Sequence, residues 1–314
     1  MFRIFSFVSC FLFYIGKAPS RMITNIKIRR WLMLSPALAV IGVLFAGGLA
    51  LAAANSLGYF APTGENALTL RHYVSLIDDR EVYASLWLTL KLATIATAIS
   101  AVAGLALALG VREASKRSRA INLLLQIPLS LPHLAMAGAL ITVIAPSGLL
   151  SRVGYALGFI QQPADFPALI NDRYGAGIVL AYSLKESPFI ALMTLALLAR
   201  LGDEYEQAAR MLGASPWQRF RNVTLPLVSP AVVSSSLIVF AFIFGAFEIP
   251  FILGRPFPAM VSVVAQQRYL DVNLAVRPGA IALAVVSTLL TGLLAWAYLR
   301  LTRSLIGLER PFIL

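Results

Sequence analysis

The chain has 314 residues, 59% of them hydrophobic and 13% charged, and its formal net charge is +12. Because soluble domains carry roughly 25% charged residues, this composition excludes a soluble globular protein and predicts an integral membrane protein. The length accommodates about six membrane spans of ~20 residues with their connecting loops. A single cysteine, Cys10, excludes any disulfide within the chain.

Long apolar segments divide the chain and predict an all-α membrane protein with about six transmembrane helices. In chain order they cover about residues 31–54, 83–109, 121–145, 175–199, 229–253 and 278–299. No long polar linker separates them, so residues 31–303 are predicted to form one transmembrane domain. Residues 1–30 are expected to be a cytoplasmic or interfacial segment, with its start left open between Met1 and Met22. Residues 304–314 are expected to be a cytoplasmic tail.

Basic residues are unequally divided between the two sides of the predicted membrane. The termini and the loops on the side of residues 203–226 hold 17 Lys and Arg, whereas the opposite loops hold 7. Since positive charge is retained on the cytoplasmic side, both termini and residues 203–226 are predicted to be cytoplasmic. The net charge is therefore a topology signal. Because it is spread over short loops, it forms no patch of the kind that binds nucleic acid.

A strongly polar stretch, residues 203–226, lies between the fourth and fifth apolar segments. A first short helix is predicted from about Asp203 to Leu212, with acidic residues at its start, where the helix dipole favours negative charge. Gly213 is a good helix stop, because glycine enters the left-handed conformation at little cost. Ser215 fits the N-cap of a second helix, and Gln218 completes a capping box. The stretch is therefore predicted to fold as two short helices on one membrane face.

These residues resemble the EAA motif of the membrane subunits of binding-protein-dependent ABC importers. The motif reads Glu-Ala-Ala, three residues, Gly, nine residues, an aliphatic residue, one residue and Leu-Pro. The matching residues are Gln207, Ala208, Ala209, Gly213, Val223, Leu225 and Pro226. Gln207 departs from the motif's Glu, and whether Gln207 or the preceding Glu206 takes over its contact is left open. The alternative interpretation is an amphipathic loop that only connects two membrane helices.

The resemblance implies a type I ABC importer permease fold, in which cytoplasmic coupling helices dock on separate ATPase subunits. The implied partners are two ABC ATPase subunits, a second permease subunit that is identical or homologous, an extracytoplasmic solute-binding protein and the lipid of the inner membrane. No cofactor is implied for this chain, whereas ATP and Mg are implied for the partner ATPase. The sequence itself holds no Gly-x-x-x-x-Gly-Lys-Ser/Thr phosphate-binding motif.

Three further segments are similar to the spermidine/putrescine-type branch of this family. They are PSGLL from Pro146, SLKESPF from Ser183 and FGAFEIPFILG from Phe244. That branch also includes iron(III), thiamine and aminophosphonate permeases. The resemblance therefore implies transport of a small polar or charged organic solute, polyamine-like or related. The solute-binding protein would deliver it onto outer loops at residues 55–81, 146–174 and 254–277.

Ionisable residues within the apolar segments are candidates for a translocation path. Lys185 and Glu186 fall near the middle of the fourth segment, and Glu248 falls toward the outer end of the fifth. Each costs about 2.5–3.5 kcal/mol at a helix centre, so each requires a partner or an aqueous cavity. The nearby Pro188 and Pro250 are expected to free backbone carbonyls along such a path. The alternative is that these charges pair with neighbouring helices and only fix the packing.

Other classes of function find less support in the sequence. The two histidines, His72 and His133, have no Cys, Asp or Glu nearby at ligand spacing, so neither a metal site nor a catalytic site is predicted. A secondary transporter or channel that uses the intramembrane carboxylates without ATP is the alternative function. It leaves the EAA-like stretch without a role, and the six spans show no obvious inverted repeat.

Overall fold

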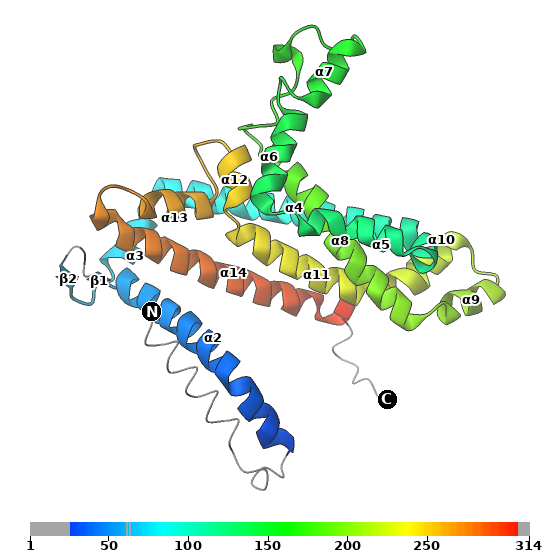
Figure 1. Ribbon diagram of the computed structural model, residues 1–314, viewed down its shortest axis with the longest axis horizontal. Coiled ribbons are helices and arrows are strands. Elements are labelled where there is room, and N and C mark those ends of the chain that lie inside the picture. Colours follow the sequence, from blue (N-terminus) through cyan, green and yellow to red (C-terminus); the bar gives the residue numbers. More distant parts are fainter. Residues whose placement is uncertain (1–25, 61, 63, 307–314) are drawn as a thin grey trace. The chain divides into compact units, whose positions relative to one another are not determined.

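The computed structural model describes residues 26–60, 62 and 64–306 (Figure 1). Its internal contacts divide the chain into two compact units, Met1–Thr69 and Leu70–Leu314, which are described separately. Most of the predicted N-terminal segment and most of the predicted tail lie outside the described residues. The prediction of an all-α membrane protein with about six spans is confirmed, because six helical segments among the described residues are long and apolar enough to cross a membrane.

The first unit contains one long apolar helix and a small hairpin. Helix α2 (Ile26–Ser56) has a membrane-length segment over Trp31–Ser56 with a mean hydropathy of 2.3. None of its apolar window is buried within the structure, and a helix that is apolar on all sides is typical of a lipid-facing span. Strands β1 (Tyr59–Phe60) and β2 (Glu65–Asn66) then pair in antiparallel register.

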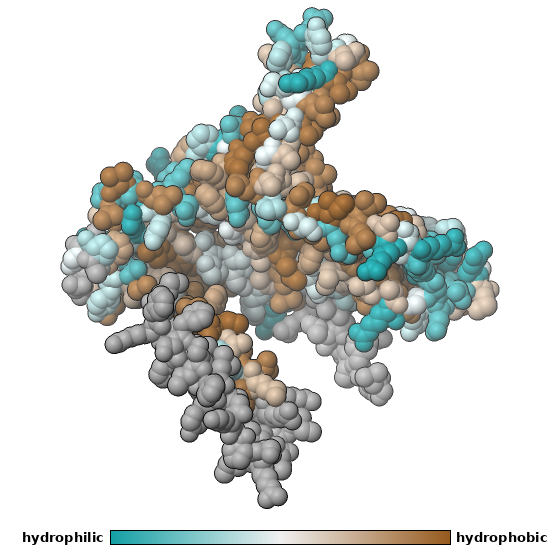
Figure 2. Space-filling model, viewed as in Figure 1, coloured by the Kyte–Doolittle hydropathy of each residue, from teal (hydrophilic) through white to brown (hydrophobic). Residues whose placement is uncertain are grey.

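The second unit consists of helices and short helical turns. They are α3 (Arg71–Ile77), α4 (Arg80–Arg117), α5 (Arg119–Ser130), α6 (His133–Ile144), α7 (Leu149–Ala156), η2 (Pro163–Asp165), α8 (Ala176–Leu201), α9 (Glu204–Met211), α10 (Pro216–Arg219), η3 (Phe220–Thr224), α11 (Leu225–Gly245), α12 (Glu248–Leu253), α13 (Val261–Tyr269), η4 (Leu274–Val276) and α14 (Arg277–Ile306). Figure 2 shows hydrophilic residues gathered around α9 and α10 and hydrophobic residues over much of the helices between the ends.

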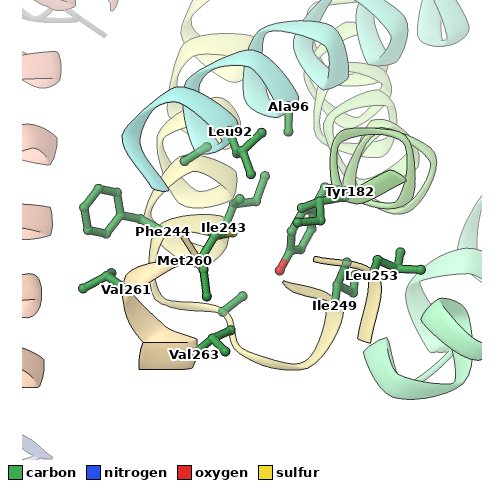
Figure 3. Close-up of a cluster of buried hydrophobic side chains, with 14 of the residues drawn as sticks. Leu92, Ala96, Tyr182, Ile243, Phe244, Ile249, Leu253, Met260, Val261 and Val263 are labelled. Atoms are coloured by element: carbon green, nitrogen blue, oxygen red, sulfur yellow. The ribbon is translucent and has the colours of Figure 1, made fainter. Parts of the chain in front are cut away.

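Helices α4 and α8 form the main contact of this unit. They approach closely at Gly104, where an added Cβ would lie 2.7 Å from the Ser187 carbonyl oxygen and 2.8 Å from Ile190 Cβ. Small residues at a helix contact allow such close packing in a membrane, where apolar burial alone does not drive helices together. Around this contact, buried side chains from α4, α8, α11, α12 and α13 form the core shown in Figure 3.

The third predicted span is not one continuous helix. Helix α5 ends at Ser130 and α6 begins at His133, so the prediction of a single helix over residues 121–145 is wrong. Leu131 adopts an extended ψ of 131°, as expected for a residue that precedes proline, and Pro132 serves as the N-cap of α6. The break exposes carbonyl groups at the end of α5, which then need hydrogen-bond donors.

The fifth predicted span is also interrupted. Helix α11 ends at Gly245, and Ala246 is extended with a ψ of 142° before the short helix α12 begins at Glu248. The prediction of one helix over residues 229–253 is therefore wrong at both ends, because α11 starts one turn earlier, at Leu225. As a consequence, Glu248 occupies the first position of a separate short helix and does not lie within the fifth membrane helix.

Candidate functional site

The polar stretch between α8 and α11 forms the predicted pair of short helices. Gly213 follows α9 with a φ of +79°, the left-handed conformation expected of a helix stop. Ser215 Oγ accepts a hydrogen bond from the Gln218 amide at 3.3 Å, and the Ser215 amide donates to Gln218 Oε1 at 2.8 Å. The predicted capping box at the start of α10 is therefore confirmed.

The second short helix continues into the membrane without a break in helical structure. A π-helical turn, η3, follows α10, and Leu225 and Pro226 form the first turn of α11. Proline has no amide donor, and a π-turn is a local interruption of the α-helical hydrogen-bond ladder. Movement of α10 would therefore act directly on α11, since no flexible loop separates them.

The outward side of this pair carries exposed apolar side chains. Met211, Leu212 and Trp217 are 83%, 89% and 65% exposed, respectively. Gln207 and Ala208 are also exposed, on the same helix as Met211. We call these five residues the docking face. Large apolar side chains that remain exposed in a polar loop are typical of a protein interaction surface.

The inward side of the pair is bound to α4 by ion pairs. Arg112 donates to Asp203 Oδ1 and to Glu206 Oε2, both at 2.8 Å, and Lys116 lies 2.6 Å from Asp203 Oδ2. The second oxygen of Glu206 accepts a hydrogen bond from Thr224 Oγ1 at 2.5 Å. The hydrogen bond from Lys116, together with the charge of Arg112, lowers the pKa of Asp203 below its ordinary 3.8. Both oxygens of Glu206 are thus engaged within this chain, whereas Gln207 faces outward.

Lys185 lies where the third span is interrupted. Its side chain is almost fully buried, and Nζ donates to the carbonyl oxygens of Pro128 at 3.0 Å and Leu131 at 2.5 Å. These carbonyls belong to the end of α5, where the helix stops before Pro132. Lys185 therefore supplies hydrogen bonds to carbonyl groups at a break in a membrane helix. These contacts agree with the alternative interpretation, in which this charge pairs with a neighbouring helix and only fixes the packing.

Glu186 and Glu248 lie near a group of aromatic side chains. Glu186 Oε1 is 3.6 Å from His133 Nε2, and the His133 ring lies 4.7 Å from that of Phe242, centroid to centroid. The Tyr182 ring is edge-on to Phe242 at 6.5 Å, and Glu186 and Glu248 both interact electrostatically with Tyr182. We call these five residues, from α6, α8, α11 and α12, the polar cluster.

The Tyr182 hydroxyl is the most unusual group of the cluster. Tyr182 has no exposed surface, and its hydroxyl has no hydrogen-bond partner among the described residues. The Nε2 atom of His133 likewise has no hydrogen bond there. Figure 3 shows the Tyr182 oxygen directed toward the α12 side of the core, close to Ile249. Buried polar groups in proteins are normally hydrogen-bonded, so these two groups distinguish the polar cluster from the apolar core around it.

The predicted site residues thus fall into two separate groups. The EAA-like residues lie on the helical pair and on the continuous helix that follows it through η3 to the first turn of α11. Glu186 and Glu248 belong to the polar cluster in the membrane part, and Lys185 binds the end of α5 instead. Sequence reasoning missed Arg112, Thr224 and Tyr182, because each is joined to its partners only by the fold. No group of three or more His, Cys, Asp or Glu within residues 26–60, 62 and 64–306 is arranged to hold a metal ion.

Most of the second unit matches a known family of membrane proteins. The family model described as "Binding-protein-dependent transport system inner membrane component" matches residues 100–306. The molybdenum transport system permease protein ModB of Azotobacter vinelandii is 28% identical over 185 residues, which cover 59% of this chain and 78% of ModB. The spermidine/putrescine transport system permease protein PotB of Haemophilus influenzae is 27% identical over 240 residues, 76% of this chain and 81% of PotB.

A solved structure is similar in fold. A bacterial alginate ABC transporter, crystallised with a periplasmic protein bound to an alginate pentasaccharide, contains a chain that aligns with a TM-score of 0.74 and 19% identity. The alignment covers 91% of this chain and 99% of that chain. The three similar proteins carry different names for their solutes, so the spermidine/putrescine-type branch is one of several that this chain resembles.

Proposed function

This chain belongs to the family of binding-protein-dependent transport system inner membrane components, and we propose that it forms the solute path of an ATP-driven ABC importer in the inner membrane. In this proposal a second permease subunit, identical or homologous, completes the path. Two ABC ATPase subunits bind on the cytoplasmic side, and a solute-binding protein delivers the solute on the other side. The EAA-like helical pair, with its exposed docking face, is the observation that carries the proposal.

The docking face supports the proposal that the ATPase binds at the helical pair. Met211, Leu212 and Trp217 are held outward by a glycine stop and a capping box, so the surface is folded before any partner binds. A preformed apolar surface loses little conformational freedom on binding. Because Glu206 is paired inward with Arg112 and Thr224, we assign to Gln207 the contact that the motif's Glu makes in this family.

The orientation of the chain rests on its basic residues. Loops on the side of α9 and α10 carry the larger share of Lys and Arg, which supports a cytoplasmic position for them by the positive-inside rule. Both termini then lie in the cytoplasm too. The opposite loops, which contain α3, α7 and α13, face the solute-binding protein.

The polar cluster supports a proposal for the class of solute that is transported. Two carboxylates, Glu186 and Glu248, interact electrostatically with Tyr182, whose hydroxyl has no hydrogen-bond partner among the described residues and whose ring is edge-on to Phe242. Carboxylates bind ammonium groups by charge-assisted hydrogen bonds, and aromatic faces attract cations. We therefore propose a small organic solute with at least one cationic group, such as a polyamine.

Proteoliposomes test the proposed function. The chain is purified with the proteins encoded beside its gene, and uptake of radiolabelled spermidine is measured with ATP, without ATP and with the ATPase inhibitor vanadate. We expect a co-purifying ATPase and uptake that requires ATP. Uptake by this chain alone, driven by an ion gradient without ATP, would instead establish the secondary transporter. ATP-dependent uptake of another solute, with no uptake of spermidine, would overturn only the substrate class.

A matched pair of variants locates the ATPase contact. Leu212→Ser removes an apolar side chain that is 89% exposed on the docking face, and Leu270→Ser removes one that is 65% exposed on the opposite side of the protein. We expect the first to reduce the amount of ATPase that co-purifies and the second to leave it unchanged. Equal amounts of ATPase with both variants would contradict docking at this face.

A further inference from the structure

Arg112 and Glu206 together join α4, α9 and the end of η3 at the inner end of α4. Its guanidinium donates to Asp203 at the start of α9 and to Glu206 within α9, each at 2.8 Å. Glu206 in turn accepts a hydrogen bond from Thr224, the residue before α11. Arg112 is only 9% exposed, whereas the Asp203 and Glu206 side chains are 39% and 31% exposed, so the guanidinium is shielded from water and its partners lie at the surface. Arg112, together with Lys116 at Asp203, thus ties the helical pair to α4, and Glu206 ties α9 to the end of η3, directly before α11.

These contacts are separate from those that fold the helical pair. The turn between α9 and α10 is made by Gly213, whose amide donates to the Arg210 carbonyl at 3.0 Å, and by the capping box of Ser215 and Gln218. None of these bonds involves α4. The ion pairs of Arg112 therefore orient a unit that already has its own local structure.

The outer end of α4 is tied to another element in the same manner. Arg268 on α13 lies 2.7 Å from Asp79 and 2.5 Å from Glu81, and Asp79 caps the N-terminus of α4 by accepting from the Glu81 amide at 2.9 Å. These contacts overcome the effect of partial burial and lower the pKa of Asp79 below 3.8. Further along α4, Thr89 Oγ1 accepts a hydrogen bond from the amide of Val261, the first residue of α13.

Between these two ends α4 is a single uninterrupted helix. It has 38 residues, which corresponds to roughly 57 Å at 1.5 Å per residue, and contains no proline. Its close approach to α8 at Gly104 restricts bending of its middle part. A continuous helix that is supported in this way moves largely as a unit, so displacement of one end is transmitted to the other.

We propose that Arg112 is a positioning residue that makes α4 follow the docking face, so that ATP-driven movement of α9 reaches α13 on the opposite side of the membrane. This inference rests on the proposed function, because it requires an ATPase that moves α9. It assigns to Glu206 an internal role, as the acceptor that joins α4 and α11 to the coupling helix. The planar guanidinium suits Arg112 to this role, since it binds two carboxylates at once, which a lysine ammonium does less well.

The first part of the test examines the contact itself, without the ATPase. Cys10 is replaced by serine, and spin labels are attached to cysteines introduced at the exposed Ala114 on α4 and Met211 on α9. With Arg112 intact we expect one narrow distance distribution between the labels. Arg112→Gln should broaden it, whereas Arg117→Gln, which removes an exposed arginine of the same helix, should leave it narrow.

The second part measures coupling in the complete transporter in proteoliposomes. We expect Arg112→Gln to retain the bound ATPase but to lose about fivefold or more of the stimulation of ATP hydrolysis by the solute-binding protein, the range of typical coupling between sites. The charge exchange Arg112→Glu with Glu206→Arg should recover part of this loss, which excludes a general folding defect. Arg117→Gln again serves as the control.

The outcomes separate the inference from the proposed function. If Arg112→Gln leaves both the label distances and the stimulation as in the unmodified protein, the positioning role is overturned. If the labels respond but stimulation does not, Arg112 only stabilises the loop and the inference is wrong. If the unmodified chain binds no ATPase, the proposed function fails, and with it the transmission along α4, whereas the label distances still report whether Arg112 holds α9.

Discussion

Lys185 on α8 donates a hydrogen bond to the carbonyl oxygen of Pro128 on α5, 57 positions earlier in the chain, at 3.0 Å. A second bond reaches the carbonyl of Leu131. Both acceptors lie where α5 stops, and their own helix no longer supplies donors there. One buried ammonium therefore makes a broken helix tolerable inside the membrane, and the break in turn places His133 at the start of α6, beside Glu186.

Loss of this ammonium should destabilise the protein. Lys185→Met keeps most of the side-chain volume but removes the donor to two backbone carbonyls at the end of α5, and a polar group left unsatisfied within the membrane costs about 1–3 kcal/mol. We expect a lower unfolding temperature in detergent. Lys91→Met is the control, since Lys91 on α4 lies over the ring of Tyr174, at 5.7 Å from its centroid, and a cation–π contact at such a site contributes only about 0.5–1 kcal/mol. Equal decreases in the unfolding temperature of the two variants would contradict this role of Lys185.

Gly213 should tolerate asparagine better than valine. Its φ of +79° costs about 1–2 kcal/mol for an ordinary L-residue, and asparagine adopts this conformation more readily than a β-branched residue does. No atom lies within 4 Å of a Cβ built at this position, so the penalty comes from the backbone alone. We expect Gly213→Val to insert into the membrane normally and to lose coupled ATP hydrolysis, with Gly213→Asn retaining most of it. Full activity of the valine variant would show that the turn geometry is not needed.

The ion pair of Asp203 should persist far into the acidic range. Because Lys116 and Arg112 favour its charged form, the pKa of Asp203 in the folded state lies below 3.8, so its stabilising contribution is present above that value. It is lost only as the pH falls through the lowered pKa. We expect the difference in unfolding temperature between the unmodified protein and Asp203→Asn to stay constant from neutral pH to about pH 5 and to shrink below 3.8. A difference that already disappears above pH 5 would show that the carboxylate is not held by these cations.

Uptake should depend on the charge of Glu248. Glu248→Gln keeps the shape of the side chain and removes a charge-assisted interaction with a cationic solute, typically about 1.5–3 kcal/mol, so uptake of spermidine at low concentration should fall about tenfold or more. Asp271→Asn removes an exposed carboxylate from the outer loop region and serves as the control. Unchanged uptake in Glu248→Gln would reduce Glu248 to a packing residue.

Tyr182→Phe, which deletes the unpartnered hydroxyl, should also lower uptake without lowering the unfolding temperature.

The helical pair was predictable because its determinants are local. Gly213, Ser215 and Gln218 act on backbone groups within three or four residues, and the structure has the turn and capping box that their order predicts. The membrane spans were predictable for a related reason, since length and apolar composition are properties of a single segment. Their interruptions were not, because a proline in an apolar segment is compatible with both a kinked and a broken helix.

The polar cluster and the ion pairs of α4 depend on contacts between distant parts of the chain. Arg112 lies 91 positions from Asp203 and 94 from Glu206, and in the sequence it is one of several basic residues after an apolar segment. Nothing local distinguishes it from Arg117, which is exposed. Tyr182 likewise reads as one aromatic residue in an apolar helix, and only the fold shows that its hydroxyl is buried without a partner.

The proposed function depends above all on the docking face as the contact with a separate ATPase. The most direct measurement is photo-cross-linking in native membranes from a benzoylphenylalanine introduced at Leu212, with the same probe at Leu270 for comparison. We predict that the probe at Leu212 captures a protein that carries an ATP-binding Gly-x-x-x-x-Gly-Lys-Ser/Thr motif, identified by mass spectrometry, and that the probe at Leu270 does not. Capture of an extracytoplasmic protein from Leu212, or of the ATPase from Leu270 alone, would contradict it.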